Sequence, residues 1–345
     1  MNYLNYIVKS KIVKRNNIQI NIPTFNDYET TKNTIKTLFN QKDIKFDILL
    51  IDNGTKDYVK LIKYFPKINY ILLKENTGSS GAQRIGAEIA LKYDYQYIIF
   101  TDNDALLLDN YGLLKMKNKL DSNTKIVAVI PQHTESFDNT LKKDFYVNSW
   151  SFHYLFVKTI VFKKIDLHAF SLFLYSDDLS LTLKIRSINK ILVCSNVKYY
   201  HYRFHPKSLQ NFYNYYYLRG TLYIIFKEKH ILFKSRINCL INFIYKMLQM
   251  FVHSLIFFDF SYIKTIILSF RGFINFNKNY LQIILSLPNK YILEEYSPER
   301  IKNPEKSGFI NLLDNYLCLL IPNKKLYLHS NYLNKNIYYR LKKNG

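Results

Sequence analysis

Apolar residues recur along the first hundred residues with two alternating periods. The segment IQINIPTF at 18–25 carries an Ile at every second position from 18 to 22 and predicts a strand, whereas NDYETTKNTIKTLFNQ at 26–41 has apolar residues at helical spacing. The alternation continues through the strands FDILLIDNG at 46–54 and INYILLKEN at 68–76 to YQYIIFTDND at 95–104. Apolar strands separated by helices predict a parallel sheet that is covered on both faces.

The pattern becomes mixed after residue 125. A helix opening at SDDLSLTLKIRSI, 176–188, is followed by the strand ILVCSNVKYYHY at 191–202. Further on, helical periodicity takes over in long aromatic and basic segments. We therefore expect two parts: an α/β domain over 1–205, and a mostly helical, basic and aromatic region over 206–345.

Composition supports a folded chain and narrows its partners. Hydrophobic residues make up 48% of the 345 residues and aromatic residues 17%, enough for a large core. The formal net charge of +23 favours an acidic partner, namely nucleic acid, an anionic membrane surface or a phosphorylated small molecule. Cys194, Cys239 and Cys318 are too few and too scattered for a disulfide framework or a zinc site, which favours a reducing, cytoplasmic compartment. The N-terminus lacks the continuous apolar run of a secretory signal, so we expect no export.

The segment RINCLINFIYKMLQMFVHSLIFF at 236–258 is long and apolar. Five polar residues interrupt it, namely Asn238, Asn242, Lys246, Gln249 and His253. A spanning helix needs about 20 predominantly apolar residues in succession. Two interpretations stay open: an amphipathic helix in the interface of an anionic membrane, or a helix packed on the first domain. The first would place the protein at the periphery of the cytoplasmic face of a membrane.

The strand YQYIIF runs directly into Asp102, Asn103 and Asp104. Carboxylates at i and i+2 can point the same way where a strand ends, and they then offer hard oxygen ligands to a divalent cation such as Mg²⁺ or Mn²⁺. A polar turn is the alternative, because Asp and Asn are favoured in turns.

Two earlier loops carry residues suited to a nucleotide. Asp52 closes the strand FDILLID, where a carboxylate either accepts hydrogen bonds from a ribose or a base, or caps the next helix. In ENTGSSGAQRIGAEIA, Gly78 and Gly81 lie where a helix opens and favours anions, and Arg84 adds a fixed positive charge. The spacing is neither G-x-G-x-x-G nor that of a P-loop, which disfavours a classical dinucleotide or ATP site.

Two further positions carry titratable groups. Asp177 and Asp178 either cap the helix that they open or place one carboxylate beside an acceptor as a general base. His201 ends the strand-like VKYYH, where a neutral imidazole either adds a nitrogen ligand to the cation or simply packs.

The order of these positions resembles glycosyltransferase family 2, the inverting nucleotide-sugar enzymes with the GT-A fold, and in particular its rhamnosyl- and galactofuranosyltransferase branch. The resemblance covers roughly residues 18–205. It implies an α/β fold of the nucleotide-diphospho-sugar transferase type with a Rossmann-like mixed sheet. It also implies a UDP- or dTDP-sugar donor.

The resemblance assigns roles to single residues. Asp178 matches the catalytic base, with Asp177 beside it. Asp102 and Asp104 look like the metal-binding pair, with Asp104 as the direct ligand and His201 on the far side of the cation. The positions that match the donor-binding loops are Pro23, Thr24, Asn26, Asp52, Asn76, Gly78, Gly81, Arg84 and Asp102.

One departure bears on activity. Lys184 stands six residues after Asp178, where the family often has Arg. It keeps open a degenerate transferase that binds its donor without turning it over.

We expect an inverting, metal-dependent transfer of a sugar from a nucleoside-diphosphate sugar to a hydroxyl of a glycan, lipid-linked or protein-linked acceptor. A nucleotidyltransferase also uses a carboxylate-bound metal on an α/β sheet, but it leaves Asp178 and His201 without roles. A basic nucleic-acid-binding protein would use the net charge and the interleaved Lys and Tyr residues. Neither accounts for the ordered acidic residues at strand ends, so we expect no nucleic-acid partner.

Overall fold

The computed structural model of the protein describes residues 6–55, 58–133, 143–202 and 210–276, together with three short strands nearer the C-terminus. The chain divides into two units. Unit 1 contains residues 1–203 and 228–236, and unit 2 contains residues 204–227 and 237–345. The boundary after residue 205 stays a prediction. Cys194 and Cys239 are buried thiols, and Cys318 lies outside the described residues.

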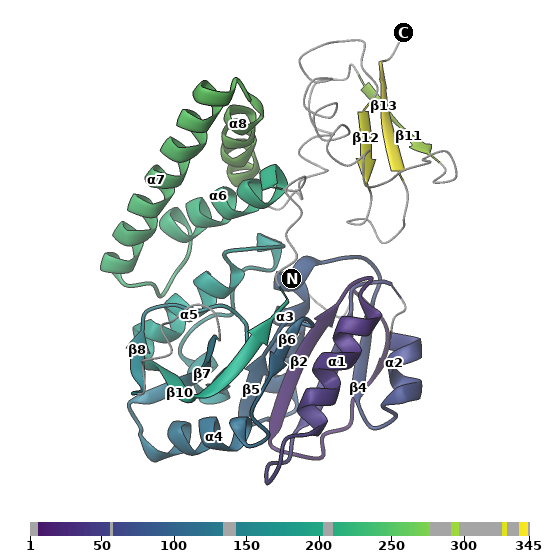
Figure 1. The fold of residues 1–345 in the computed structure, drawn as a ribbon, viewed down its shortest axis with the longest axis vertical. Coiled ribbons are helices and arrows are strands. Elements are labelled where there is room, and N and C mark those ends of the chain that lie inside the picture. The colour runs from purple at the N-terminus through teal and green to yellow at the C-terminus, as the bar shows by residue number, and fades with distance from the viewer. Residues whose placement is uncertain are drawn as a thin grey trace. The chain divides into compact units, whose positions relative to one another are not determined.

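A ten-stranded mixed sheet forms the centre of unit 1 (Figure 1). Its strand order is β1-β4-β3-β2-β5-β9-β7-β10-β6, and β8 pairs with β10. The strands are β1 (Ile7–Lys11), β2 (Ile18–Thr24), β3 (Asp47–Asp52), β4 (Asn69–Leu73), β5 (Tyr97–Phe100), β6 (Ala105–Leu107), β7 (Ile126–His133), β8 (Phe145–Val147), β9 (Leu155–Lys158) and β10 (Lys190–His201). Strands β2, β3, β4 and β5 run parallel, whereas β9 is antiparallel to both β5 and β7. The predicted α/β fold with a mixed sheet is confirmed.

Helices cover both faces of this sheet. They are α1 (Tyr28–Phe39), α2 (Tyr58–Tyr64), α3 (Gly78–Lys92), α4 (Gly112–Ser122) and α5 (Asp177–Ile188), with short 3₁₀ turns at Thr159–Lys163 and Phe170–Leu172. Successive side chains of β3 point to opposite faces of the sheet. Ile48 and Leu50 pack with α1, α2 and α4, whereas Leu49 and Ile51 pack with α3. The continuous apolar runs therefore reflect strands that are buried on both sides.

Helix α3 lies close to the sheet because Gly86 leaves room for a buried amide. A Cβ at Gly86 would lie 2.3 Å from the amide nitrogen of Asn21. Gln19 donates hydrogen bonds to the Asn21 side chain (2.7 Å) and to the Gly86 carbonyl (2.7 Å). Gln83 donates to the Thr101 carbonyl (2.9 Å), directly after β5. These bonds hold the first half of α3 beside the carboxyl ends of the strands.

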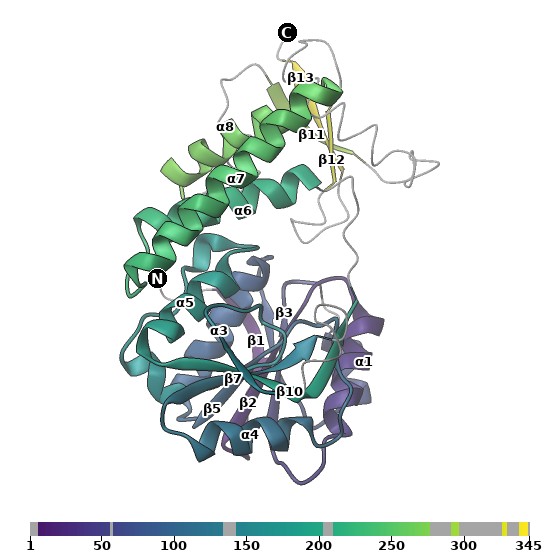
Figure 2. The same cartoon turned by 60° about the vertical axis from the view of Figure 1, so that its left-hand side comes forward.

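Unit 2 holds three helices that lie side by side in both views (Figures 1 and 2). They are α6 (Gln210–Phe226), α7 (Phe233–Phe257), whose first turn belongs to unit 1, and α8 (Ser261–Ile274). Leu218, Leu222, Phe243 and Met250 form their shared core. This helical region confirms the prediction. An antiparallel sheet of β11 (Tyr291–Tyr296), β13 (Tyr338–Lys343) and β12 (Leu326–His329), which the pattern did not predict, follows.

A buried ion pair fixes the segment between α6 and α7 to unit 1. The Lys184 ammonium contacts the Glu228 carboxylate, and both side chains are 3% exposed. Lys184 also donates to the Leu167 carbonyl (3.1 Å), and the Ser180 hydroxyl donates to Glu228 (3.1 Å). Lys184, the departure from the family pattern, thus has a structural partner of its own. Since both charges are buried, removing one leaves the other uncompensated.

We expect Glu228→Gln to lower the free energy of unfolding by about 3 to 5 kcal/mol, because the Lys184 charge would remain buried without its partner. Urea denaturation followed by circular dichroism measures this loss. Glu29→Gln serves as the control, because the Glu29 carboxylate is 74% exposed and 3.9 Å from Lys32. That substitution should cost less than about 1 kcal/mol. If both variants lose the same free energy of unfolding, the buried Lys184–Glu228 pair does not stabilise the protein more than an exposed pair does.

Candidate active site

Strand pairing brings two acidic residues and two histidines together at the end of the sheet where β5 and β10 finish. Phe100 of β5 pairs with Leu155 of β9, and continuing this antiparallel register by two residues sets Asp102 opposite His153. On the other side, His201 of β10 pairs with Ala105 of β6. Asp104, directly before β6, therefore lies beside His201. These four residues meet because β9 and β6 both run antiparallel to the strands beside them.

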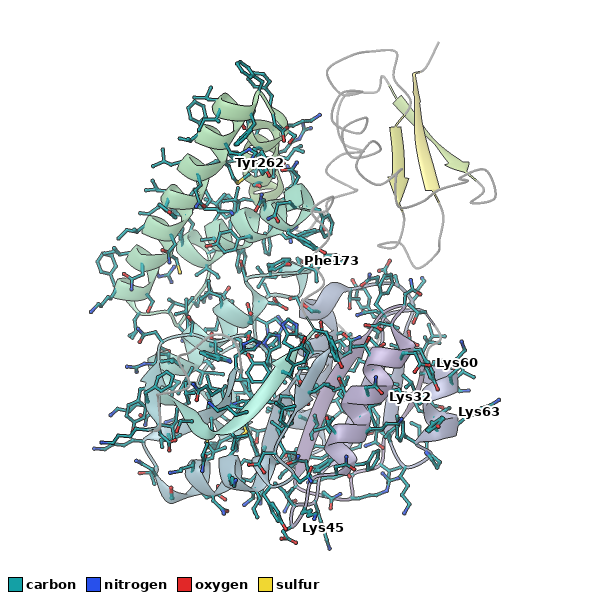
Figure 3. The ribbon with its side chains drawn as sticks, viewed as in Figure 1. Lys32, Lys45, Lys60, Lys63, Phe173 and Tyr262 are labelled. Atoms are coloured by element: carbon teal, nitrogen blue, oxygen red, sulfur yellow. The ribbon has the colours of Figure 1, made fainter. Side chains whose placement is uncertain are left out.

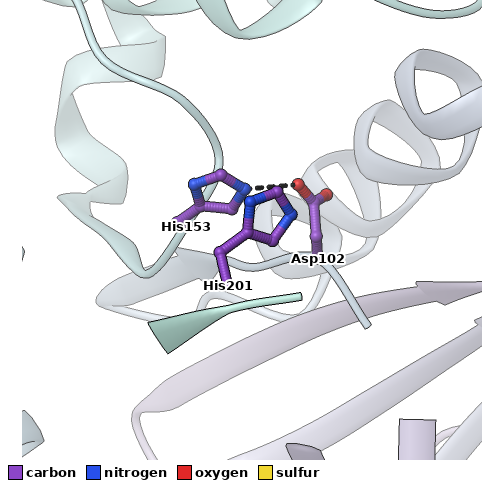
Figure 4. Close-up of side chains that lie close together, drawn as sticks. All are labelled: Asp102, His153 and His201. Atoms are coloured by element: carbon purple, nitrogen blue, oxygen red, sulfur yellow. Dashed lines mark ion pairs between the residues drawn. The ribbon is translucent and has the colours of Figure 1, made fainter. Parts of the chain in front are cut away.

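Each histidine contacts one of the carboxylates, and Figure 4 marks the pair of His153 with Asp102. The Nε2 of His153 lies 3.2 Å from an Asp102 oxygen, and the Nε2 of His201 lies 3.1 Å from an Asp104 oxygen. The two imidazole rings are tilted against each other with centroids 4.0 Å apart. Potential ligand atoms of Asp102, His153 and His201 all lie within 4.8 Å of one another. One carboxylate oxygen and two imidazole nitrogens at this separation fit a single divalent cation.

The predicted and observed clusters differ in one member. Asp102 and His201 were both predicted as ligands, and the structure brings them together. His153 was not predicted. Asp104 was predicted as the direct ligand, and here its carboxylate pairs with His201. The assignment of ligand roles to these residues stays a prediction.

His153 is held in place by its other ring nitrogen. Its Nδ1 lies 2.7 Å from the Ser151 hydroxyl and 3.1 Å from the Tyr199 hydroxyl. The sequence signal for His153 is a histidine two residues before the strand that pairs with β5. This histidine can be recognised as part of the cluster only when the antiparallel pairing of β9 with β5 is known.

The loop at Asp102 is anchored to helix α1. The amide of Asn103 donates to Asp27 (3.1 Å) and Thr31 (3.1 Å), and the Thr34 hydroxyl donates to the Asn103 carbonyl (2.7 Å). Asn103 therefore holds the loop while Asp102 and Asp104 on either side turn toward the histidines.

The Asp102 carboxyl is held in its charged form. Burial raises its pKa, but the hydrogen bond with His153 and the charges of His153 and His201 outweigh this and keep the pKa below its ordinary value. The cluster is therefore prepared to present an anionic oxygen to a cation.

Asp177 and Asp178 open helix α5 after a strained turn. Phe173, Tyr175 and Ser176 all have left-handed backbones, with φ of 68°, 56° and 63°. Such conformations cost about 1 to 3 kcal/mol each for residues with side chains, and they cluster at functional sites. Here they turn the chain so that two carboxylates enter the first turn of α5.

The two carboxyls of this pair have different surroundings. Asp177 is buried and accepts a hydrogen bond from the Ser79 hydroxyl (2.8 Å). Asp178 is half-buried and accepts from the backbone N–H of Leu179 (2.7 Å). Burial raises the pKa of both, helped by the charge of Asp178 for Asp177 and by the charge of Asp102 for Asp178. The pair thus holds a proton more readily than ordinary carboxyls do.

The glycine-rich loop before α3 is tied to the turn before α5. Gly78 has φ +71°, and a Cβ there would lie 1.9 Å from the Phe173 carbonyl oxygen. The N–H of Ser80 donates to that same oxygen (3.1 Å), and Asn76 accepts from the N–H of Gly78 (2.8 Å). Phe173, labelled in Figure 3, therefore joins the predicted donor loop to the predicted base.

Asp52 has a structural task at the end of β3. Its fully buried carboxylate accepts hydrogen bonds from the N–H and hydroxyl of Thr55 (2.7 and 2.9 Å) and from the N–H of Tyr58 (2.9 Å), where α2 begins. Of the two interpretations of Asp52 from the sequence, the structure shows the one in which it caps the next helix. Its predicted contact with a nucleotide stays a prediction.

The remaining predicted donor residues lie near the carboxyl ends of β2 and β4. Pro23 and Thr24 end β2, and the Thr24 hydroxyl lies 2.9 Å from that of Thr31. Asn26 is exposed, with a left-handed backbone (φ 53°). Gly81 is buried in the first turn of α3.

Arg84 is already engaged by protein groups. It pairs with Glu88 (2.9 Å) and donates to the His168 carbonyl (2.8 Å). These two contacts use Nε and Nη1 of the guanidinium, and the predicted phosphate contact stays a prediction. His168 itself is buried, which lowers its pKa to about 3, and its ring lies 2.8 Å from the Ser80 carbonyl. His168 is therefore a neutral structural residue that braces the same loop.

Comparison with known protein families identifies most of unit 1. Residues 20–178 match the model of glycosyl transferase family 2, a range that includes the sheet edge, Asp102, His153 and Asp178. This stretch, which is under half of the 345 residues, is similar to glycosyltransferase family 2 domains. The predicted resemblance to glycosyltransferase family 2 is confirmed over this stretch, and the mixed α/β sheet agrees with the predicted GT-A fold.

Two curated proteins share sequence with parts of this chain. An uncharacterized glycosyltransferase of Rickettsia bellii is 29% identical over 116 residues, which are 33% of this chain and 16% of that protein. An uncharacterized protein of Methanocaldococcus jannaschii is 34% identical over 90 residues, which are 24% of this chain and 38% of that protein. The chain thus spans well under half the length of either relative.

Solved structures of similar chains include those of two proteins. S. aureus TarS is 18% identical, with a TM-score of 0.47, over 66% of this chain and 42% of its own. A shorter form of TarS has been solved with UDP-GlcNAc; it is 14% identical, with a TM-score of 0.48, over 87% of this chain and 80% of its own. The mannosyltransferase PcManGT from Pyrobaculum calidifontis, solved with GDP-Man and Mn²⁺, is 12% identical, with a TM-score of 0.49, over 79% of this chain and 91% of its own.

We expect Asp177 to make the stability of the protein depend on pH. Its folded pKa is raised, so its contribution is fully present below the unfolded pKa of about 4 and is lost as the pH rises through the folded value. Asp177→Asn should therefore be more stable than the parent protein at about pH 8, and this advantage should shrink at about pH 5. Urea denaturation of both proteins at both pH values measures the difference. An advantage that does not change with pH would contradict the raised pKa.

Proposed function

We propose that the protein is an inverting glycosyltransferase that moves a sugar from a nucleoside-diphosphate sugar to an acceptor hydroxyl. The observation that carries this proposal is the meeting of Asp102, His153 and His201 at the sheet edge of a glycosyltransferase family 2 domain. The reaction breaks the bond between the anomeric carbon and the diphosphate and forms one to the acceptor oxygen. The acceptor proton passes to a base, and the nucleoside diphosphate leaves.

Asp102, His153 and His201 would hold a divalent cation, Mg²⁺ or Mn²⁺, with Asp104 beside them. When bound, such a cation offsets the negative charge that builds on a departing diphosphate. Three observations support these residues: the charged state of Asp102, the closeness of the two rings, and the support of His153 by Ser151 and Tyr199.

Asp178 is the base in this proposal. Its half-buried carboxylate is accessible, whereas Asp177 is buried against Ser79. Burial raises the pKa of Asp178, and the charge of Asp102 adds to that rise. A carboxyl with a raised pKa is a stronger base once it is ionised, as a general base must be.

The donor would lie along the carboxyl ends of β2, β3 and β4, where ligands bind in sheets of this kind. We propose Pro23, Thr24, Asn26 and Asp52 for its nucleoside side. The loop from Asn76 through Gly78 and Gly81 to Arg84 would face its diphosphate. A UDP- or dTDP-sugar is the donor that the family resemblance favours.

We further propose a glycan or lipid-linked acceptor and a peripheral location on the cytoplasmic face of a membrane. What supports the location is the apolar surface of helix α7, which is long and apolar enough to enter a membrane and has only 17% of its apolar window buried. Among the described residues it is the one helix with that property.

Asp178→Asn should lower the turnover number about 10²- to 10⁴-fold, because the acceptor hydroxyl would lose its proton acceptor. Affinity for the donor should stay nearly unchanged, since Asp178 acts on the acceptor side. Donor binding is measured by calorimetry with UDP-sugars and dTDP-sugars, and turnover by release of the nucleoside diphosphate. Ser187→Ala at the far end of α5 is the control and should keep full turnover. A variant that retains normal turnover would remove Asp178 from the mechanism.

Asp102→Asn should abolish the increase in donor affinity that Mn²⁺ or Mg²⁺ produces. Tyr199→Phe, which removes one hydrogen bond to His153, should weaken cation binding by about 10- to 100-fold. Calorimetric titration with Mn²⁺ alone, and then with UDP in its presence, separates cation binding from donor binding. If both variants bind Mn²⁺ like the parent protein, the cation site lies elsewhere.

A further inference from the structure

Helix α7 has an unbroken exposed apolar side. Its buried residues, Cys239, Phe243, Met250 and Ser254, recur at spacings of four and seven and face the core of unit 2. Ten exposed large apolar residues form this side, namely Ile237, Leu240, Ile241, Ile244, Tyr245, Leu248, Phe251, Val252, Leu255 and Ile256, whereas Phe257 at the end of the helix is exposed outside it. At helical spacing these fall within one arc of about 160°. We call this set the α7 apolar face.

The polar residues of α7 form a separate stripe. Asn238, Asn242, Lys246, Gln249 and His253 follow one another at spacings of four, four, three and four. Helical geometry gathers them into an arc of about 80°, between the buried side and the α7 apolar face. The residues that interrupt the apolar run in the sequence therefore leave the apolar face intact in space.

Helix α8 extends the apolar surface. Ile267, Phe270 and Ile274 are exposed at spacings of three and four. The ring of Phe270 lies edge-on to that of Phe243 of α7, with centroids 5.9 Å apart, so the two helices present neighbouring apolar strips. Contiguous apolar surface of this kind marks a binding site for a protein or a membrane.

The charges near α7 distinguish a membrane from a second copy of the chain. Helix α7 contains no Asp or Glu. Lys227, Lys229 and Lys234 are exposed at and before its first turn, and Glu228 among them is buried against Lys184. Exposed charge there is therefore positive, which attracts anionic lipid headgroups and repels another copy of the same basic surface.

We propose that the α7 apolar face, extended by Ile267, Phe270 and Ile274, binds an anionic bilayer with helix α7 lying in the plane of the interface. In this orientation the apolar face enters the acyl boundary and the polar stripe stays among the headgroups. A spanning orientation would carry the polar stripe through the hydrocarbon, where polar side chains are costly. Membrane binding by this surface does not depend on the proposed function. Its biological role does, because that role is to bring the proposed transferase to a lipid-linked acceptor.

The test is co-sedimentation of the full chain with vesicles of phosphatidylcholine, alone or mixed with phosphatidylglycerol. Ile244→Glu with Leu248→Glu should weaken partitioning into the mixed vesicles by more than about tenfold, because the burial of even one Leu-sized side chain is worth about that factor. The matched control, Asn242→Glu with Gln249→Glu, adds the same charge to the polar stripe of the same helix and should lose much less. Lys229→Gln with Lys234→Gln should reduce the preference for the anionic vesicles.

Three results would overturn the proposal. The first is an equal loss of binding in the apolar-face and polar-stripe variants. The second is resistance of the bound protein to extraction by alkaline carbonate, which would indicate a spanning helix. The third is a dimer, seen by light scattering without vesicles, that Ile244→Glu with Leu248→Glu dissociates, because the face would then join two copies.

Metal-dependent binding of a nucleotide sugar in solution is measured on the same variants. Both helix variants should retain it, together with the circular dichroism of the parent protein. Loss of vesicle binding with retained donor binding supports the membrane surface. Absent donor binding in the parent protein would instead count against the proposed transferase, whatever the vesicles show.

Discussion

The antiparallel pairing of β9 with both β5 and β7 is the interaction on which the site depends. It inserts a reversed strand between parallel ones, and its register sets His153 across from Asp102. A one-residue slip would turn every side chain of β9 to the opposite face of the sheet. The apolar residues of β9, which are buried in the core, oppose such a slip. Core packing thus determines the geometry of the polar cluster.

Much of the fold was predictable because its strongest signals are local. The strands β2, β3, β4 and β5 are rich in Ile and Leu and are almost entirely buried, and the intervening helices have clear periodicity. Asp102, Asp177 and His201 were also recognisable, because each stands where an element begins or ends. The parts that could not be predicted depend on pairing between distant segments, and His153 is the clearest example.

Other roles depend on competition between partners, which sequence patterns do not encode. Asp52 was a candidate for the nucleotide, yet its carboxylate is fully engaged by Thr55 and Tyr58. Arg84 was a candidate for phosphate, yet it pairs with Glu88. Lys184 looked like a weakened version of a family arginine, yet it forms a buried ion pair with Glu228 that the linear sequence gave no reason to expect. In each case the residue type indicated which kind of group the side chain could bind, but the sequence did not show which partner it binds.

The position of Glu228 has a consequence for how the two units can be separated. The residues that complete unit 1 are split along the chain, because 228–236 are encoded after the first helix of unit 2. Cleavage or gene splitting near residue 205 would deprive unit 1 of the counter-ion for Lys184. The covalent order of the chain therefore makes unit 1 dependent on a segment that is translated after the first helix of unit 2, and the buried charge of Lys184 is neutralised only when that segment has been made.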